Sequence, residues 1–238
     1  MAERNYLARA FEIAASPAWY PLLERAADLR LPAAVRAPLF RALARVGGID
    51  LDEVDGPLDR FGTLGEFFAR PLRREARPVD PDAAVWVSPS DGELQATGSF
   101  PAGSDPVVAV KGAGLAVGRA LGPHAPAVAG GGHYFVVYLS PRDYHRVHSP
   151  VSGRIRSWQS LPGTRFPVNR LGYRARPDVL SCNERVIVEL EATRGGRLFV
   201  VLVAAFGVAR TRLSFVEPDE LRARVGDPPV TLDPPVER

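Results

Sequence analysis

Hydrophobic and polar positions divide the chain into an N-terminal part with a helical period and a longer part of short β-like runs. Residues 5–48 predict two or three short helices: YLARAFEIAAS, PLLERAADLR opened by Pro21, and APLFRALARVGG opened by Pro38 and stopped by Gly47 and Gly48. From about residue 84, glycine and proline separate apolar runs of strand length: AVWVSP, DGELQATGSF, PVVAVKG, HYFVVYLSP, GRIRSWQSL, RVIVELEAT and RLFVVLVAAFGVA. Short strands without alternating helices favour a β-sandwich or barrel-like core. The predicted class is α+β, mostly β, with short amphipathic helices first.

Changes in hydrophobic period and in composition along the chain predict three parts: a helical segment over 1–55, a β-rich core over 56–225 and a proline-rich tail over 226–238 that is extended or disordered. Two segments of the core, SPSDGEL (88–94) and SPVSGRI (149–155), share one pattern: Ser-Pro, any two residues, glycine, any residue, and an aliphatic residue. We call this internal similarity the echo. Proline suits an extended entry and glycine a turn with positive φ, so both segments read as one strand-turn-strand corner in two related halves. A duplicated core would bring Asp91 near the histidine segment.

The third predicted helix is basic and amphipathic. Four arginines and no acid lie between Leu29 and Ile49. Such a helix, with Trp19 and Tyr20 nearby, suits the headgroup region of an anionic membrane. Docking of the same helix on the core is the alternative, because amphipathicity serves both purposes. The expected membrane-contacting side chains are Arg36, Leu39, Phe40, Arg41, Leu43 and Arg45.

Composition narrows the function classes. A formal charge of +3 over 238 residues, without a dense Lys/Arg run, argues against nucleic-acid binding. Cys182 is the only cysteine, which excludes an internal disulfide and fits a reducing compartment. No secretory leader is visible, and the longest apolar run, Leu198 to Ala209, is too short to span a bilayer. We therefore expect a peripheral protein on the cytoplasmic side of the cell membrane.

The segment YLSPRDYHRVHSP (138–150) places two of the four histidines, His145 and His148, one helical turn apart. As metal ligands they would need Asp143, Asp91 or His133 to complete the site, and no firm spacing supports this. They are otherwise packed side chains or acid–base groups. A dense polar cluster directly after an apolar strand favours acid–base catalysis.

The same residues carry a resemblance to a known family. YLSPRDYHRVHSPVSG resembles the histidine motif of the phosphatidylserine decarboxylases, pyruvoyl enzymes that convert phosphatidylserine to phosphatidylethanolamine and CO2. Four further segments resemble the family's motifs in the same order along the chain: LGEFFARPLRREARPVDPD, VSPSDGEL, AVKGAGLAV and LSCNERVIVEL. The resemblance implies a β-rich catalytic core preceded by membrane-associating helices.

The resemblance also implies roles for individual residues. Asp91 would be the orienting carboxylate and His148 the general base that activates a serine hydroxyl, while His145 and Asp143 would lie at the substrate and assist proton transfer. In this family a Gly-Ser dipeptide is cut, and the serine becomes a pyruvoyl group whose carbonyl forms a Schiff base with the substrate amine.

The sequence departs from the family at that serine. No Gly-Ser follows residue 104, and Val208-Ala209-Arg210 stands where the family has Val-Gly-Ser. We therefore expect the polypeptide alone to be inactive. Three accounts stay open: an inactive lipid-binding homologue, a separately encoded small chain with Gly-Ser-Thr, or a shortened sequence. The expected partners are phosphatidylserine or another anionic phospholipid, a membrane surface, that small chain, and a second copy of this chain.

Overall fold

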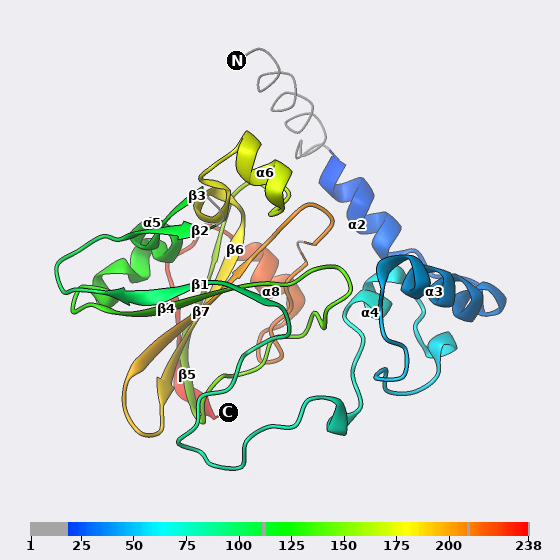
Figure 1. The fold of residues 1–238 in the computed structure, drawn as a ribbon, viewed down its shortest axis with the longest axis horizontal. Coiled ribbons are helices and arrows are strands. Elements are labelled where there is room, and N and C mark those ends of the chain that lie inside the picture. Colours follow the sequence, from blue (N-terminus) through cyan, green and yellow to red (C-terminus); the bar gives the residue numbers. More distant parts are fainter. Residues whose placement is uncertain (1–18, 111–112, 209, 238) are drawn as a thin grey trace. The chain divides into compact units, whose positions relative to one another are not determined.

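The computed structural model describes residues 19–110, 113–208 and 210–237 (Figure 1). The chain folds as two units, each with its own core. Among the described residues, the sheet unit comprises those of 95–136 and 152–237, together with Trp19 and Tyr20. The helical unit comprises residues 21–94 and 137–151. The helix expected over YLARAFEIAAS lies outside the described residues.

The helices and strands follow one another in this order: α2 (Tyr20–Asp28), α3 (Ala33–Gly47), η2 (Leu58–Arg60), α4 (Leu64–Phe68), η3 (Arg74–Ala76), β1 (Glu93–Phe100), β2 (Val107–Val110), β3 (Ala113–Ala116), α5 (Val117–Leu121), η4 (Gly122–Val128), β4 (Gly132–Tyr138), β5 (Gly153–Leu161), α6 (Arg170–Ala175), α7 (Val179–Cys182), β6 (Arg185–Ala192), β7 (Arg197–Val203), α8 (Pro218–Ala223) and β8 (Val230–Glu237).

The largest sheet is antiparallel, with strand order β7-β6-β5-β8. Strand β6 pairs with β5 from Gly153↔Ala192 to Leu161↔Arg185, and a bulge interrupts β5 between Ile155 and Ser157. The proline-rich tail is extended, because β8 completes the edge of this sheet through pairs such as Trp158↔Val230. Six of the expected β-like runs contain the strands β1, β2, β4, β5, β6 and β7.

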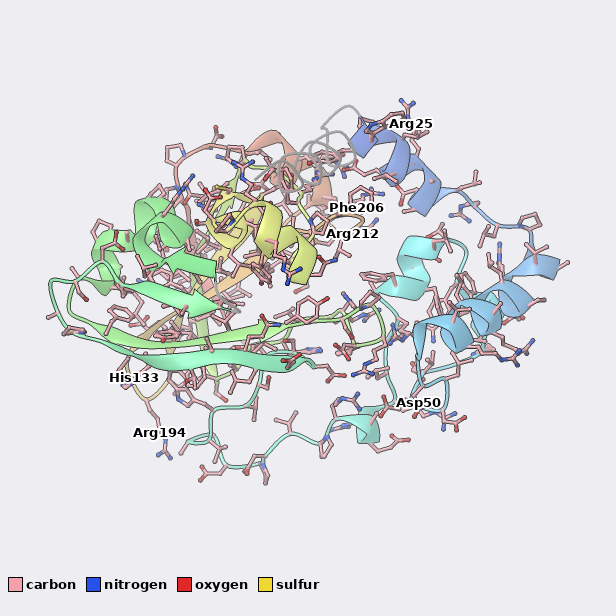
Figure 2. All side chains as sticks on the ribbon, turned by 45° about the horizontal axis from the view of Figure 1, so that its top comes forward. Arg25, Asp50, His133, Arg194, Phe206 and Arg212 are labelled. Carbon is pink, nitrogen blue, oxygen red and sulfur yellow. The ribbon has the colours of Figure 1, made fainter. Side chains whose placement is uncertain are left out.

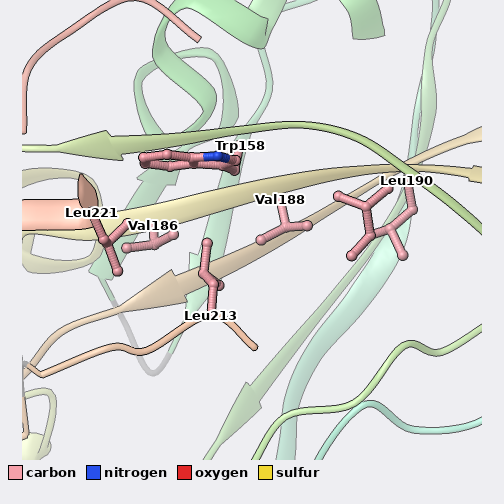
Figure 3. Close-up of a cluster of buried hydrophobic side chains, with 7 residues drawn as sticks. Trp158, Val186, Val188, Leu190, Leu213 and Leu221 are labelled. Carbon is pink, nitrogen blue, oxygen red and sulfur yellow. The ribbon is translucent and has the colours of Figure 1, made fainter. Parts of the chain in front are cut away.

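A hydrophobic cluster covers this sheet. Trp158 of β5 is 1% exposed and lies above the aliphatic side chains of β6 (Figure 3). Leu213 and Leu221, from the segment after β7, close the cluster from the other side. Because buried apolar side chains contribute roughly 1.5–3 kcal/mol each, this layer stabilises the sheet unit, together with a second buried cluster that includes Val110 and Phe166.

The smaller sheets are two-stranded: β1 pairs with β4, and β2 pairs with β3. The predicted class, short N-terminal helices followed by antiparallel sheets, is confirmed, and the described residues form no closed barrel. The strand expected in AVWVSP is wrong, because residues 84–88 form no ladder. Trp86 is 56% exposed there, and the two backbone bonds donated by this stretch run from Val85 N–H to Asp82 C=O and from Val87 N–H to Pro150 C=O. Apolar residues without a partner strand do not form a sheet.

The helical unit corrects one helix boundary and confirms another. Helix α3 begins at Ala33, so Pro38 lies inside it and does not open it. The expected stop is confirmed: Gly48 adopts φ 71°, and its N–H donates to Ala44 C=O. Glycine adopts this left-handed conformation without a Cβ penalty. The three-part division at residues 55 and 225 stays a prediction.

Candidate active site in the helical unit

The predicted catalytic residues lie in the helical unit, on two motif segments. Asp91 precedes β1, and the loop of residues 139–150 that follows β4 carries both histidines; we call it the histidine loop. Gly92, next to Asp91, has φ 132°, and a Cβ there would meet Tyr138 O at 2.4 Å. Glycine is therefore required where the two segments approach each other.

A short helix anchors the histidine loop. Helix α4 is capped by Thr63, whose Oγ1 accepts from Glu66 N–H at 3.1 Å, in a Thr-x-x-Glu pattern typical of helix starts. At its other end Arg146 Nε donates to Ala69 C=O at 2.8 Å. Arg70 Nη2 donates to the carbonyls of Arg142 and Asp143, at 2.7 and 3.2 Å. These bonds fix the loop against the C-terminal end of α4.

An aromatic cluster joins α3 to α4. The Phe40 and Phe67 rings stack at a centroid distance of 4.5 Å, and Phe61 packs edge-on against both. Phe40 is fully buried in this cluster. The expectation that Phe40 contacts a membrane is therefore wrong, because its side chain packs inside the aromatic cluster.

Asp91 is held by arginine. Arg77 donates to both carboxylate oxygens, from Nε at 2.7 Å and Nη2 at 2.6 Å, and also binds Glu53 through two further bonds. These hydrogen bonds are the largest cause that lowers the pKa of Asp91, and the backbone N–H of Tyr144 acts in the same direction. Asp91 is therefore a carboxylate at neutral pH, paired with a guanidinium.

The histidines have separate partners. His145 Nδ1 lies 2.8 Å from Asp143 C=O. A carbonyl can only accept, so Nδ1 carries the hydrogen and Nε2 keeps its lone pair. Burial, against the Phe68 ring at 3.9 Å, lowers the pKa of His145. His145 is therefore a neutral base with a defined tautomer.

His148 is the more exposed of the two. Its Nε2 lies 3.0 Å from Tyr144 Oη, and the two rings stack at 5.5 Å. Burial raises the pKa of Tyr144, so the phenol is protonated at neutral pH. In this structure Asp91 bonds to Arg77 and His148 bonds to Tyr144, and among the described residues no hydrogen bond or ion pair joins the expected orienting carboxylate to the expected base.

Asp143 closes the histidine loop on itself. Its Oδ2 accepts from both Ser140 N–H at 2.6 Å and Ser140 Oγ at 2.8 Å. Asp143 thereby holds the backbone carbonyl that fixes the tautomer of His145. Among the described residues, no three histidine, cysteine, aspartate or glutamate side chains are grouped to hold a metal, and His133 lies on β4 in the other unit.

A polar cavity of about 150 Å³ lies beside these groups. Asp50, which follows α3 and is labelled in Figure 2, lines both this cavity and a second hollow of about 350 Å³ along α3. The cavity is rich in both signs of charge. Its lining residues are Gly48, Asp50, Glu53, Arg70, Leu72, Arg77, Asp91, Arg142, Asp143 and Tyr144.

Sequence reasoning missed two arginines of this site, Arg70 and Arg77. Both lie in the segment FFARPLRREARP, where arginine is so frequent that no single position stands out. No local signal in the sequence singles out Arg70, because its burial depends on the histidine loop that packs against it.

The Asp91–Arg77 pair predicts a pH-dependent stability. The folded pKa of Asp91 lies below its ordinary value, so the ionised carboxylate contributes stability that is present above about pH 4 and is lost as pH falls through the lowered pKa. Asp91→Asn should lower the free energy of unfolding by about 1 kcal/mol at pH 7, because Arg77 is partly exposed. The difference should vanish in acid. Urea titrations across pH measure this, with the exposed Glu75→Gln as control; a difference that persists at pH 2 would contradict it.

Comparison of the sequence with known proteins assigns the chain to a family. The sequence model of phosphatidylserine decarboxylase matches residues 64–226. A phosphatidylserine decarboxylase proenzyme of Anaeromyxobacter sp. is 42% identical over 182 residues, covering 76% of this chain and 63% of that protein. One of Myxococcus xanthus is 34% identical over 204 residues, covering 85% and 71%, and one of Bordetella avium is 38% identical over 187 residues, covering 77% and 62%. The match extends over Asp91, the histidine loop and the buried β6 strand. The chain thus belongs to the phosphatidylserine decarboxylase family.

Proposed function

We propose that this chain takes part in the decarboxylation of phosphatidylserine to phosphatidylethanolamine and CO2. The observation that carries the proposal is His145, a neutral imidazole of defined tautomer on the family's histidine motif, whose neighbours in sequence Asp143 and Tyr144 line a charged cavity. The chain spans less than two thirds of the Anaeromyxobacter relative, so the activity of a whole decarboxylase is part of the proposal.

The family depends on a pyruvoyl group, and the donor set of this site fits one. A ketone and its attached carbonyl accept hydrogen bonds, and the Tyr144 hydroxyl, from a residue that lines the cavity, is protonated at neutral pH and can donate one. When bound, the group supplies the electrophilic carbonyl that withdraws electrons from the substrate as CO2 leaves. Tyr144 would hold the group, and its serine precursor belongs to the proposal.

Proton transfer is the part that this chain's own residues perform. Loss of CO2 from the serine headgroup leaves a carbon that must gain one proton. The Nε2 atom of His145, which has a lone pair in the neutral imidazole, takes up a proton from solvent and delivers it to this carbon, which returns His145 to its neutral form. Because burial lowers the pKa of His145, its protonated form is a stronger acid than an ordinary imidazolium.

The N-terminal helices support a lipid substrate. Leu22 and Val46 are exposed apolar side chains on α2 and α3. Arg41 and Arg45 line the hollow of about 350 Å³ along α3. We propose that this surface contacts an anionic membrane through Leu39, Arg41, Leu43 and Arg45, at the cytoplasmic face. Arg36 is the weaker member, because its guanidinium donates to the carbonyls of Leu31 and Asp59.

Among the helices that the structure describes, none has the length and apolar character to cross a bilayer. A small partner chain with Gly-Ser-Thr and self-association remain part of the proposal.

The test is CO2 release from carboxyl-labelled phosphatidylserine. The chain is expressed from its native locus with the neighbouring reading frames, in cells that lack their own decarboxylase, and flotation on phosphatidylserine vesicles is measured in parallel. Labelled CO2 above the empty-vector level is expected. Flotation without CO2 would replace the decarboxylase by the lipid-binding alternative. Absence of both would refute the proposal.

A further inference from the structure

Arg70 is a buried guanidinium whose hydrogen bonds are incomplete. It is 3% exposed, and its Cζ lies 5.9 Å from the centre of the Phe67 ring. Nη2 donates to two carbonyls of the histidine loop, whereas Nε and Nη1 have no partner among the described residues. A buried charge with unmade hydrogen bonds is costly unless something binds it. Holding the loop explains Nη2 and leaves Nε and Nη1 unexplained.

The neighbouring cation differs from Arg70 in this respect. Arg77 also lines the cavity, but Asp91 and Glu53 saturate it with four hydrogen bonds. Arg70 makes no ion pair with a carboxylate of the described residues; Asp91, Glu53 and Asp143 act on it only at longer range. Arg142, the third arginine of the lining, is paired with Asp143 at 3.7 Å and is 69% exposed, so water competes for it. Arg70 is therefore the buried cation of this cavity that is available to an anion.

The cavity suits a zwitterionic ligand. Its volume of about 150 Å³ far exceeds what one water needs, roughly 10–15 Å³. Besides Arg70 it is lined by carboxylates, including Asp50 and Asp143. A guanidinium fork binds two oxygens of one anion, and carboxylates bind an ammonium. A phospholipid headgroup with an amine carries both groups.

We infer that Arg70 binds the phosphodiester of the aminophospholipid headgroup in this cavity, an inference that rests on the proposed function. The carboxylate of serine is the other anion of that headgroup. It loses its charge as CO2 leaves, so a cation bound to it would stabilise the substrate more than the transition state. The phosphodiester keeps its charge throughout. Arg70 is thus a positioning residue that holds the headgroup while its carboxylate departs.

Calorimetric titration of the full chain with glycerophosphoethanolamine tests this inference, because that probe has the phosphodiester and the amine but no carboxylate. We expect binding by the unmodified chain and at least about tenfold weaker binding by Arg70→Gln and by Arg70→Lys, which keeps the charge but lacks the fork. The matched control is Arg74→Gln, since Arg74 is exposed on the same segment. Its affinity should equal that of the unmodified chain.

Other probes separate the sources of the anion. L-serine and inorganic phosphate, titrated into the unmodified chain, should bind at least about tenfold more weakly than glycerophosphoethanolamine. Equal affinity for inorganic phosphate would assign the site to free phosphate and overturn the headgroup assignment. Loss of only L-serine binding in Arg70→Gln would assign Arg70 to the carboxylate and overturn it as well.

A measurement on the unmodified chain keeps the inference falsifiable if the variants do not fold. The ¹⁵N Nε–Hε resonance of Arg70 should shift on titration with glycerophosphoethanolamine, and an unchanged resonance at saturation would refute the inference. Binding needs no turnover. Headgroup binding through Arg70 without CO2 release would therefore defeat the proposed function alone, and CO2 release with Arg70-independent binding would defeat this inference alone.

Discussion

Expressed with the neighbouring reading frames, the His145→Asn variant is expected to release CO2 from phosphatidylserine about 10²–10⁴ times more slowly than the unmodified chain expressed in the same way, the range for loss of a positioned acid–base group. The asparagine amide can still donate to the Asp143 carbonyl, as Nδ1 of the imidazole does at 2.8 Å. The loop should therefore keep its conformation while the proton-carrying Nε2 is lost. The measurement is labelled CO2 release under single-turnover conditions, with unfolding curves to verify the fold.

His133→Asn is the matched control for this prediction. His133 is exposed on β4 in the sheet unit, so its replacement should leave the rate unchanged. The pH profile gives a second readout. Burial lowers the pKa of His145, so the limb of the pH–rate profile that reports its titration should have its midpoint below the ordinary imidazole pKa of about 6.5. A His145→Asn rate within twofold of the unmodified rate would exclude His145 from proton transfer.

Asn183→Ala should lower the free energy of unfolding of the sheet unit by about 3–5 kcal/mol, because it leaves buried backbone groups without partners. Asn183 is fully buried before β6, and its amide makes four hydrogen bonds. Oδ1 accepts from Thr164 Oγ1 and Phe166 N–H, and Nδ2 donates to the carbonyls of Phe166 and Ala204. This one side chain joins three segments of the sheet unit. Urea unfolding followed by tryptophan fluorescence measures the loss.

Thr164→Val is the graded control, since it removes one of the four bonds and should cost about 1 kcal/mol. A small effect of Asn183→Ala, equal to that of Thr164→Val, would contradict the structural role of the amide. Asn183 lies in the segment LSCNERVIVEL, which resembles a family motif. In the structure, asparagine at this position satisfies four hydrogen bonds inside the sheet unit, which is a structural role independent of catalysis.

The sequence predicted which segments form the candidate site, but it did not predict which side chains are hydrogen-bonded to one another. The histidine segment stands out because polar residues cluster directly after an apolar strand, and Asp91 stands out through the echo between SPSDG and SPVSG. The echo was partly right in structural terms, since Ser88–Gly92 and Ser149–Gly153 each lead into a strand, but positive φ occurs at Gly92 and not at Gly153. The sequence could not predict which group binds the Asp91 carboxylate, because several arginines between residues 70 and 77 lie close enough to it in the chain.

The sequence by itself determined the elements whose signals are local. The apolar runs of β5, β6 and β7 and the glycine stop of α3 were readable because side-chain period and backbone freedom act between near neighbours. Only the tertiary structure decided that AVWVSP forms no strand, that Phe40 is buried between aromatic rings, and that Arg77 and Arg70 have such different surroundings. Pairing, burial and ion pairs join residues far apart in the chain, so their free energy depends on what the fold brings beside each side chain.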